Sequence, residues 1–255
     1  MTDKDSPLLV SFERGVLRLT LNRPSRHNAL GPDLIRRLET TLRERSTDES
    51  VRVVVVSGGR RAFSIGADLK DLPRDAEERA GALDAVLPRF QTMIVRLAHF
   101  PAPTIAAIGG LATGAGLDLA LACDLRIASK TARLGSAFVR TGLIPDGGGT
   151  FRMPRLVGLG RAFELLLAGA PITAEKAGAM GLVNRVVPAA DLEASARALA
   201  RSIADLPPGA VRAVKRLMLS NLGEDFEGAL AAEAIEQSVR FRSDEFEMGL
   251  KNLER

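Results

Sequence analysis

The chain has 255 residues, 46% of them hydrophobic and 26% charged, which is typical of a globular protein with a full core. The net charge of +4 is spread along the chain and the aromatic residues are ten Phe, so no basic stripe or stacking platform for nucleic acid is indicated. One cysteine and two histidines exclude an intrachain disulfide and offer no zinc site, and no apolar run is long enough to cross a bilayer.

The first half of the chain predicts strands that alternate with helices. Apolar and polar residues alternate on both sides of Arg14-Gly15, which favours a β-hairpin. The elements expected next are a helix opened by Pro32, a buried strand at 51–58, a loop around 63–68, a helix at 75–100 with Pro88 as a place for a kink, and a buried strand at 103–110. This alternation is typical of α/β proteins.

The second half of the chain predicts mostly helices. After residue 150 the pattern is helical nearly to the end. The elements expected here are a glycine-rich turn with an apolar helix within 111–123, short strands at 124–129 and 132–135, and three helices after Pro207 that are separated at Gly223 and Ser243. An α/β core followed by a helical tail is therefore predicted.

Three glycine-containing segments lie where strands are expected to end: FSIGADLK at 63–70, GAGLDLALACD at 114–124 and GLIPDGGGT at 142–150. In open α/β folds, ligands bind at such strand ends. Gly66-Ala67 and Gly114-Ala115 would leave backbone N–H groups free, and the N–H groups that open a helix can hold a developing oxyanion. Each segment taken alone is better explained by close packing of its glycines.

Taken together, these segments resemble the crotonase, or enoyl-CoA hydratase/isomerase, family over nearly the whole chain. The motifs stand in the family's order: LNRPSRHNAL, FSIGADLK, GGLATGAGLDLALACDLRIAS, GLIPDGGGT, PRLVG and AEKAGAMGLVNRVVP. The resemblance implies a ClpP-like ββα-superhelix core and a C-terminal helical region used in trimerisation, with a homotrimer or homohexamer as the assembly. We accordingly expect a crotonase core domain at residues 1–195 and a helical region at residues 196–255.

The resemblance also implies an acyl-CoA thioester as the substrate. Its carbonyl oxygen would accept hydrogen bonds from the backbone N–H groups of Ala67 and Ala115, which stabilise an enolate. The positions that match the family's substrate and CoA contacts are Arg26, Ile65, Gly66, Lys70, Gly114 and Phe138. Among them, the carbonyl of Ile65 matches the contact to the adenine amino group, and either Arg26 or Lys70 would pair with a CoA phosphate. The reaction requires no metal or redox cofactor, since coenzyme A belongs to the substrate.

The sequence departs from the hydratases of the family, which use two glutamates to activate and deliver water. At the first of these positions stands Asp118, a carboxylate one methylene shorter, on the helix face that also carries Gly114 and Ala115. At the second position stands Phe138, which cannot transfer a proton. The two-carboxylate scheme for hydration is therefore incomplete in this sequence.

Asp146 is the only acidic residue within 125–163, a stretch that contains seven Arg or Lys. Some isomerases of the resembling family carry a catalytic aspartate in this Pro-Asp-Gly turn. An apolar setting near Phe138 and Leu143 would raise the pKa of Asp146, whereas the N-terminus of a following helix would lower it. Asp146 is thus either the cap of a helix that starts near Gly148 or a catalytic base.

We expect the protein to catalyse double-bond isomerisation of an enoyl-CoA, with Asp146 as the proton shuttle and the amides of Ala67 and Ala115 as oxyanion donors. The alternatives are hydration of a 2-enoyl-CoA through Asp118, and binding of acyl-CoA without catalysis. Cys123 lies in an apolar stretch and fits a buried thiol in a reducing cytosol. Because the N-terminus shows no signal peptide, we expect a cytoplasmic protein with neither a membrane nor a nucleic acid as partner.

Overall fold

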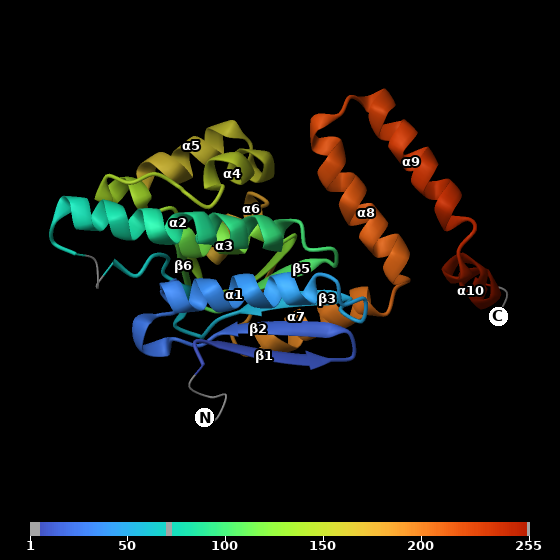
Figure 1. Cartoon of the computed structure of the whole chain (residues 1–255), viewed down its shortest axis with the longest axis horizontal. Helices are drawn as coiled ribbons and strands as arrows, with labels where there is room; N and C mark the ends of the chain where they lie inside the picture. The colour runs from blue at the N-terminus through green and yellow to red at the C-terminus, as the bar shows by residue number, and fades with distance from the viewer. Residues whose placement is uncertain (1–5, 70–72, 254–255) are drawn as a thin grey trace.

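The computed structural model describes residues 6–69 and 73–253. Its larger sheet has six strands in the order β1-β2-β3-β5-β7-β10, of which β1, β2, β3 and β5 are labelled in Figure 1. The strands span Leu8–Glu13 (β1), Val16–Leu21 (β2), Val53–Ser57 (β3), Thr104–Ile108 (β5), Leu125–Ser129 (β7) and Arg185–Val187 (β10). β1 and β2 form an antiparallel hairpin, as predicted around Arg14-Gly15, and the remaining neighbours pair in parallel. The α/β class is confirmed.

A second, smaller sheet has the strand order β4-β6-β8-β9. Its strands span Ala62–Ser64 (β4), Leu111–Thr113 (β6), Arg133–Gly135 (β8) and Ile172–Thr173 (β9). Three predictions were wrong in part: the loop around 63–68 missed β4, the glycine-rich turn that opens 111–123 missed β6, and the helical pattern after residue 150 missed β9 and, in the larger sheet, β10. Strands of two or three residues contain too few alternating positions to show the period of a strand.

The helices follow the predicted order, with α1 opened by Pro32 and α2 continuous through Pro88. They span Pro32–Arg45 (α1), Ala76–Ala98 (α2), Ala115–Ala122 (α3), Gly149–Val157 (α4), Leu159–Ala168 (α5), Ala174–Ala179 (α6), Leu192–Ala204 (α7), Pro208–Ser220 (α8), Phe226–Arg240 (α9) and Asp244–Leu253 (α10). Short 3-10 helices lie at Pro24–Arg26, Phe138–Thr141 and Asn221–Gly223. The predicted breaks near Gly223 and Ser243 separate α8, α9 and α10.

The core lies on both faces of the larger sheet, because alternate residues of β3 point to opposite sides. Val54 and Val56 belong to the apolar cluster that includes α1, α2 and α3. Val53 and Val55 belong to a second cluster, in which the alanines of α7 cover the other face. The larger sheet is therefore buried on both faces, which explains why residues 53–56 are all valine.

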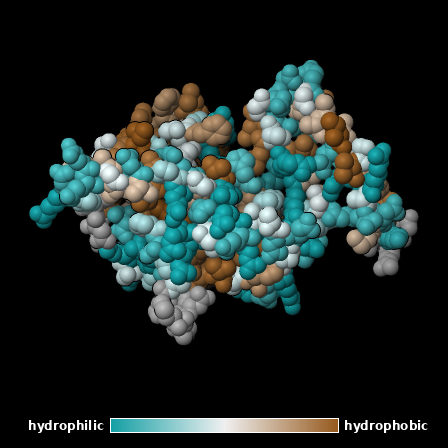
Figure 2. Space-filling model, in the orientation of Figure 1, coloured by the Kyte–Doolittle hydropathy of each residue, from teal (hydrophilic) through white to brown (hydrophobic). Residues whose placement is uncertain are grey.

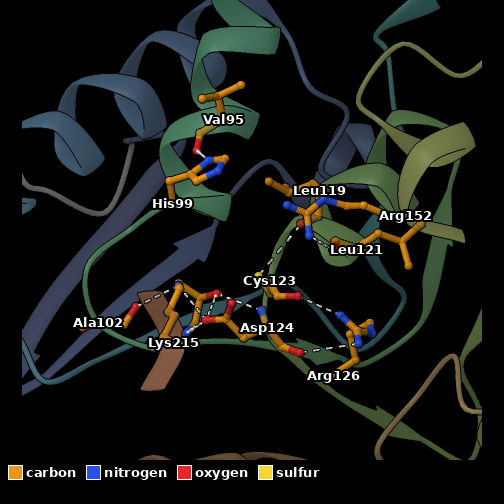
Figure 3. A network of polar contacts seen from close by, with 11 residues as sticks. Val95, His99, Ala102, Leu119, Leu121, Cys123, Asp124, Arg126, Arg152 and Lys215 are labelled. Atoms are coloured by element: carbon orange, nitrogen blue, oxygen red, sulfur yellow. Dashed lines mark hydrogen bonds and ion pairs between the residues drawn. The ribbon is translucent and has the colours of Figure 1, made fainter. Parts of the chain in front are cut away.

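The helices α8, α9 and α10 stand beside the body of the molecule (Figure 1). α8 is fastened to it by Lys215, whose ammonium donates to the carbonyl of Ala102 at 3.1 Å and pairs with Asp124 at 2.7 Å (Figure 3). Cys123, next to Asp124, is buried as expected, and burial raises the pKa of its thiol to about 12. Among the described residues, no helix is long and apolar enough to cross a membrane.

Candidate active site

The two backbone N–H groups predicted to bind an oxyanion lie in neighbouring loops that follow β4 and β6. These strands pair in parallel, so the loop after Ser64 runs beside the start of α3. Gly66 has φ +92°, and a Cβ built on it would lie 2.9 Å from the amide nitrogen of Ala115. The structure therefore brings the segment that contains Ala67 against the first residue of α3.

Neither of these two amides is used by the fold within the described residues. The N–H of Ala115 is the first of α3, and the preceding Gly114 supplies no side-chain cap. No hydrogen bond from the N–H of Ala67 or of Ala115 to another described atom is present. Both amides are thus free to donate to a negatively polarised oxygen, and the positive end of the α3 dipole favours such a ligand.

Ile65, Gly114 and Phe138 surround the opening of α3. A Cβ on Gly114 would lie 3.9 Å from the Phe138 ring and 4.0 Å from the carbonyl oxygen of Ile65. That carbonyl already accepts a hydrogen bond from the hydroxyl of Thr113 at 3.2 Å, which leaves one lone pair for a further donor. The Phe138 side chain is buried, so an apolar ring stands at the position that the resemblance matches to the hydratases' second glutamate.

Asp118 lies on α3, one turn after Ala115, and is only 2% exposed. Its Oδ2 accepts the backbone N–H of Gly147 at 3.0 Å. Burial raises the pKa of Asp118 to about 7; the negative charge of Asp146 adds to the increase, whereas hydrogen bonds from the N–H groups of Gly147 and Gly149 oppose it. Asp118 therefore exchanges its proton close to neutral pH.

Asp146 lies in the turn before α4, close enough to Asp118 to affect its ionisation. Its Oδ1 is buried without a hydrogen-bond partner among the described residues, and burial raises the pKa of the carboxyl above its usual range. α4 begins at Gly149 after Gly148 and has no side-chain cap, so Asp146 does not cap this helix. A partly desolvated carboxylate with one unpartnered oxygen has the properties of a general base.

Arg26 is one of the two basic residues expected to pair with a CoA phosphate. Its guanidinium lies 3.7 Å from the carboxylate of Asp68. Arg23 pairs more closely with the same carboxylate at 2.8 Å, and the two arginines line a cavity of about 470 Å³ together with Ser25. Lys70, the other predicted phosphate contact, lies outside the described residues. Within the described ranges, no group of three or more His, Cys, Asp or Glu is arranged to hold a metal ion.

The sequence reasoning missed two residues of α2 that contact the turn of Asp146. The side-chain amide of Gln91 donates to the carbonyl of Asp146 at 3.2 Å. A Cβ on Gly147 would lie 3.0 Å from the ring of Phe90, so this ring packs directly against the turn. These contacts join positions more than fifty residues apart, and no local pattern in the sequence pointed to them.

Fold and site together define an α/β protein of the crotonase type, in which the segment of Ala67 lies against the first residue of α3 and a carboxylate, Asp118, follows on the same helix. The family model described as enoyl-CoA hydratase/isomerase matches residues 11–255. The chain therefore belongs to the enoyl-CoA hydratase/isomerase family, and it is an enzyme of that type.

This chain is similar to relatives named as isomerases and to relatives named as hydratases. The 1,2-epoxyphenylacetyl-CoA isomerase of Escherichia coli is 36% identical over 244 residues, which cover 95% of this chain and 93% of the relative. The 2,3-dehydroadipyl-CoA hydratase of Escherichia coli is 38% identical over 228 residues, covering 89% and 88%. The crystal structure of an enoyl-CoA hydratase from Bacillus anthracis superimposes with a TM-score of 0.93 at 35% identity, covering 97% of this chain and 96% of that one.

Proposed function

We propose that the protein moves the double bond of an enoyl-CoA, with Asp146 carrying the proton. The observation that supports this proposal most directly is the buried Oδ1 of Asp146, which has no partner among the described residues. Its turn is joined through the Gly147–Asp118 hydrogen bond to the helix that begins with the Ala115 amide. The similarity to an isomerase that acts on a CoA thioester agrees with this activity.

In the proposed reaction, the thioester carbonyl oxygen of a 3-enoyl-CoA accepts the N–H groups of Ala67 and Ala115. The carboxylate of Asp146 takes a proton from C2, and the electron pair of that bond moves into a dienolate whose charge lies on the carbonyl oxygen. The proton returns from Asp146 to C4, which leaves the double bond between C2 and C3. A raised pKa makes Asp146 a stronger base near neutral pH, which favours the first step. Beyond the coenzyme A of the substrate, the scheme requires no cofactor.

Hydration of a 2-enoyl-CoA is the rival activity, and the similarity to a hydratase keeps it open. Activation of water in the two-glutamate scheme needs a second carboxylate where this chain has the buried ring of Phe138. The remaining carboxylate, Asp118, already accepts a backbone N–H from Gly147. Isomerisation needs only one carboxylate and therefore fits the side chains of this site better.

The test compares wild type, Asp146→Asn and Asp118→Asn with a 3-enoyl-CoA and, separately, with a 2-enoyl-CoA. We expect Asp146→Asn to lower isomerase kcat by at least ~100-fold, since a positioned general base contributes about that much. The binding affinity for an unreactive acyl-CoA serves as the control for an intact site. Isomerisation that survives Asp146→Asn excludes the proposal, hydration lost only in Asp118→Asn supports the rival, and tight binding without turnover of either substrate indicates a binding protein.

We also propose that the chain assembles into trimers or hexamers, as the family resemblance implies, and that it acts in the cytoplasm. Large apolar side chains are exposed along the C-terminal helices, among them Met218 at 69%, Phe226 at 72% and Ile235 at 71%. A further apolar patch covers α4 and α5, and both areas are visible in Figure 2. Extended apolar surfaces of this kind mark protein–protein contacts, and copies of this chain are the partners we propose.

A further inference from the structure

Asp118 is a buried carboxylate on a helix whose other side chains are apolar. Burial of a carboxylate is unfavourable unless hydrogen bonds stabilise it. Here the N–H groups of Gly147 and Gly149 supply this stabilisation, the first at 3.0 Å from Oδ2. Both belong to the segment around Asp146, so the bonds that compensate burial also join α3 to the turn that carries the proposed base.

The shape of the turn is matched to this carboxylate. A Cβ on Gly147 would lie 2.7 Å from Cβ of Asp118, and a Cβ on Gly149 would lie 2.4 Å from its Oδ1. Both distances are shorter than van der Waals contact, so a side chain at either glycine would displace Asp118. The glycines after Asp146 therefore provide the space that the Asp118 side chain fills.

The opposite side of the turn is held by α2. The ring of Phe90 packs against Gly147, and Gln91 donates to the carbonyl of Asp146. The backbone of the turn is thus clamped between α2 and α3, whereas the Asp146 carboxylate keeps an unpartnered oxygen. Such an arrangement fixes the backbone of the turn and leaves Oδ1 of Asp146 without a hydrogen bond to the described part of the fold.

We infer that Asp118 is a positioning residue, which holds the Gly147 amide and so fixes the carboxylate of Asp146 relative to the N–H of Ala115. The inference rests on the proposed function of Asp146 as the base. α3 contributes both the oxyanion donor Ala115 and, one turn later, Asp118, so one rigid helix sets the spacing of donor and base. Spacing of this kind matters because a misplacement of about 1 Å can lower a rate ~100-fold.

The hold on the turn depends on pH. Among the described groups around Asp118, Asp146 is the titratable group whose charge raises the pKa of Asp118. From α2, the neutral side chains of Phe90 and Gln91 face the turn. The charged Arg152 of α4 donates to the carbonyl of Leu121, at the far end of α3. As pH falls through about 7, Asp118 takes up a proton. A neutral carboxyl accepts an N–H less strongly than a carboxylate, so the turn is held less firmly on the acidic side.

The kinetic test measures kcat and KM for a 3-enoyl-CoA across pH in wild type, Asp118→Asn and Asp118→Ala. Asn keeps one acceptor for the Gly147 N–H but no charge, so we expect kcat to fall about tenfold, and about 100-fold in the Ala variant. KM should stay within about threefold, since neither variant alters the amides that bind the thioester. In wild type we expect kcat to decrease as pH falls through about 7, because Asp118 takes up a proton there. The Asn variant cannot titrate at this position, so this decrease should be absent from it.

Asp124→Asn is the matched control, because Asp124 follows the same helix but contacts Thr104 and Lys215 instead of the turn. We expect it to keep the kcat and the pH profile of wild type. Two results overturn the inference. One is an Asp118→Asn variant with unchanged kcat and an unchanged acidic limb of its pH profile; the other is an Asp118→Asn variant as inactive as Asp146→Asn, which would make Asp118 the proton carrier.

A second measurement separates this inference from the proposed function. Hydrogen exchange of the Gly147 amide reports the hold on the turn without any turnover, and we expect exchange at least about tenfold faster in Asp118→Ala than in wild type. Equal exchange rates would refute the positioning role even if isomerase activity is found. If Asp146→Asn retains activity while Gly147 exchange responds to Asp118, the proposed base is wrong and the anchoring of the turn stands.

Discussion

Asp118 and Asp146 are neighbouring carboxylates in different surroundings, which agree with the different roles that we propose for them. Asp118 is almost fully buried and accepts the N–H groups of the turn. Asp146 is half-buried and has an oxygen without a partner among the described residues. Burial raises the pKa of both, but a carboxylate whose hydrogen bonds are already made is held in place, whereas one with a bare oxygen can take a proton. Because both residues are aspartates, only their environments distinguish them.

The raised pKa of Asp118 predicts a specific dependence of stability on pH. In the unfolded chain an Asp has a pKa of about 3.9, and in the folded protein the pKa of Asp118 is about 7. Between these values the native state binds more protons than the unfolded state, so this group lowers stability as pH rises. Above pH 7 this loss of stability has reached its full value and no longer changes with pH, and below pH 4 it is absent.

Asp118→Asn removes this titration, so its free energy of unfolding relative to wild type should increase from pH 4 to pH 8. The increase has an upper bound of about 4 kcal/mol, from a shift of about three pKa units. Urea unfolding of both proteins at several pH values measures it. Parallel stability curves over this range would contradict a pKa of about 7 for Asp118.

The turn between the 3-10 helix at Phe138–Thr141 and α4 is the element on which the site depends most, and its glycines can be tested directly. In Gly149→Ala, the new Cβ would lie 2.4 Å from Oδ1 of Asp118 and 3.2 Å from Cβ of Pro145. We expect a loss of about 1–3 kcal/mol in stability, as for other overpacked sites, with a drop in kcat because Asp146 moves. Thermal unfolding and isomerase assays measure the two effects.

Gly160→Ala is the matched control for this prediction. Gly160 lies in the first turn of α5, where an added Cβ meets nothing within 4 Å. Because Ala favours a helix over Gly, the control should gain up to about 1 kcal/mol in stability and keep full activity. Equal effects of the two substitutions would mean that the contact of Gly149 with Asp118 has no energetic importance.

The larger elements could be predicted because their residues repeat with a clear period. Residues 53–56 are four valines of a doubly buried strand, and Leu34, Ile35, Leu38 and Leu42 form one buried face of α1. The short strands β4, β6, β9 and β10 were missed, because pairing with neighbours, and not local pattern, makes them strands. The domain boundary after residue 195 falls within α7 and stays a prediction.

The part of the site that could be predicted from the sequence consists of residues within the motifs that stand in the family's order. The segments around Ala67 and Ala115 were expected to converge, and the structure places them side by side. The choice between cap and base for Asp146 depended on where α4 begins and on which oxygens are buried, and sequence contains neither fact. The contact of Asp118 with Gly147 likewise joins two motifs whose relative placement is set by tertiary packing.

At the scale of the whole molecule, the C-terminal helices are fastened to the body at one end and expose apolar residues beyond it. The fastening is polar: Lys215 pairs with Asp124, and Arg212 donates to the carbonyls of Glu49 and Val51 at 3.0 Å (Figure 3 shows the Lys215 contacts). α9 has no buried residue of its own. A helix that contributes no buried residue to the core of its own chain, yet exposes large apolar side chains, agrees with the assembly that we propose.

Ile235 is 71% exposed on α9, and Ile235→Asp should therefore weaken the proposed assembly. Burial of one such side chain contributes about 2 kcal/mol, so the dissociation constant should rise by at least about tenfold. Sedimentation equilibrium over a range of concentrations measures it, and Gln237→Asp, at an exposed polar position of the same helix, controls for the added charge. Identical mass distributions for Ile235→Asp and wild type would mean that this face of α9 remains open to solvent, and α4 with α5 would then be the surface to test.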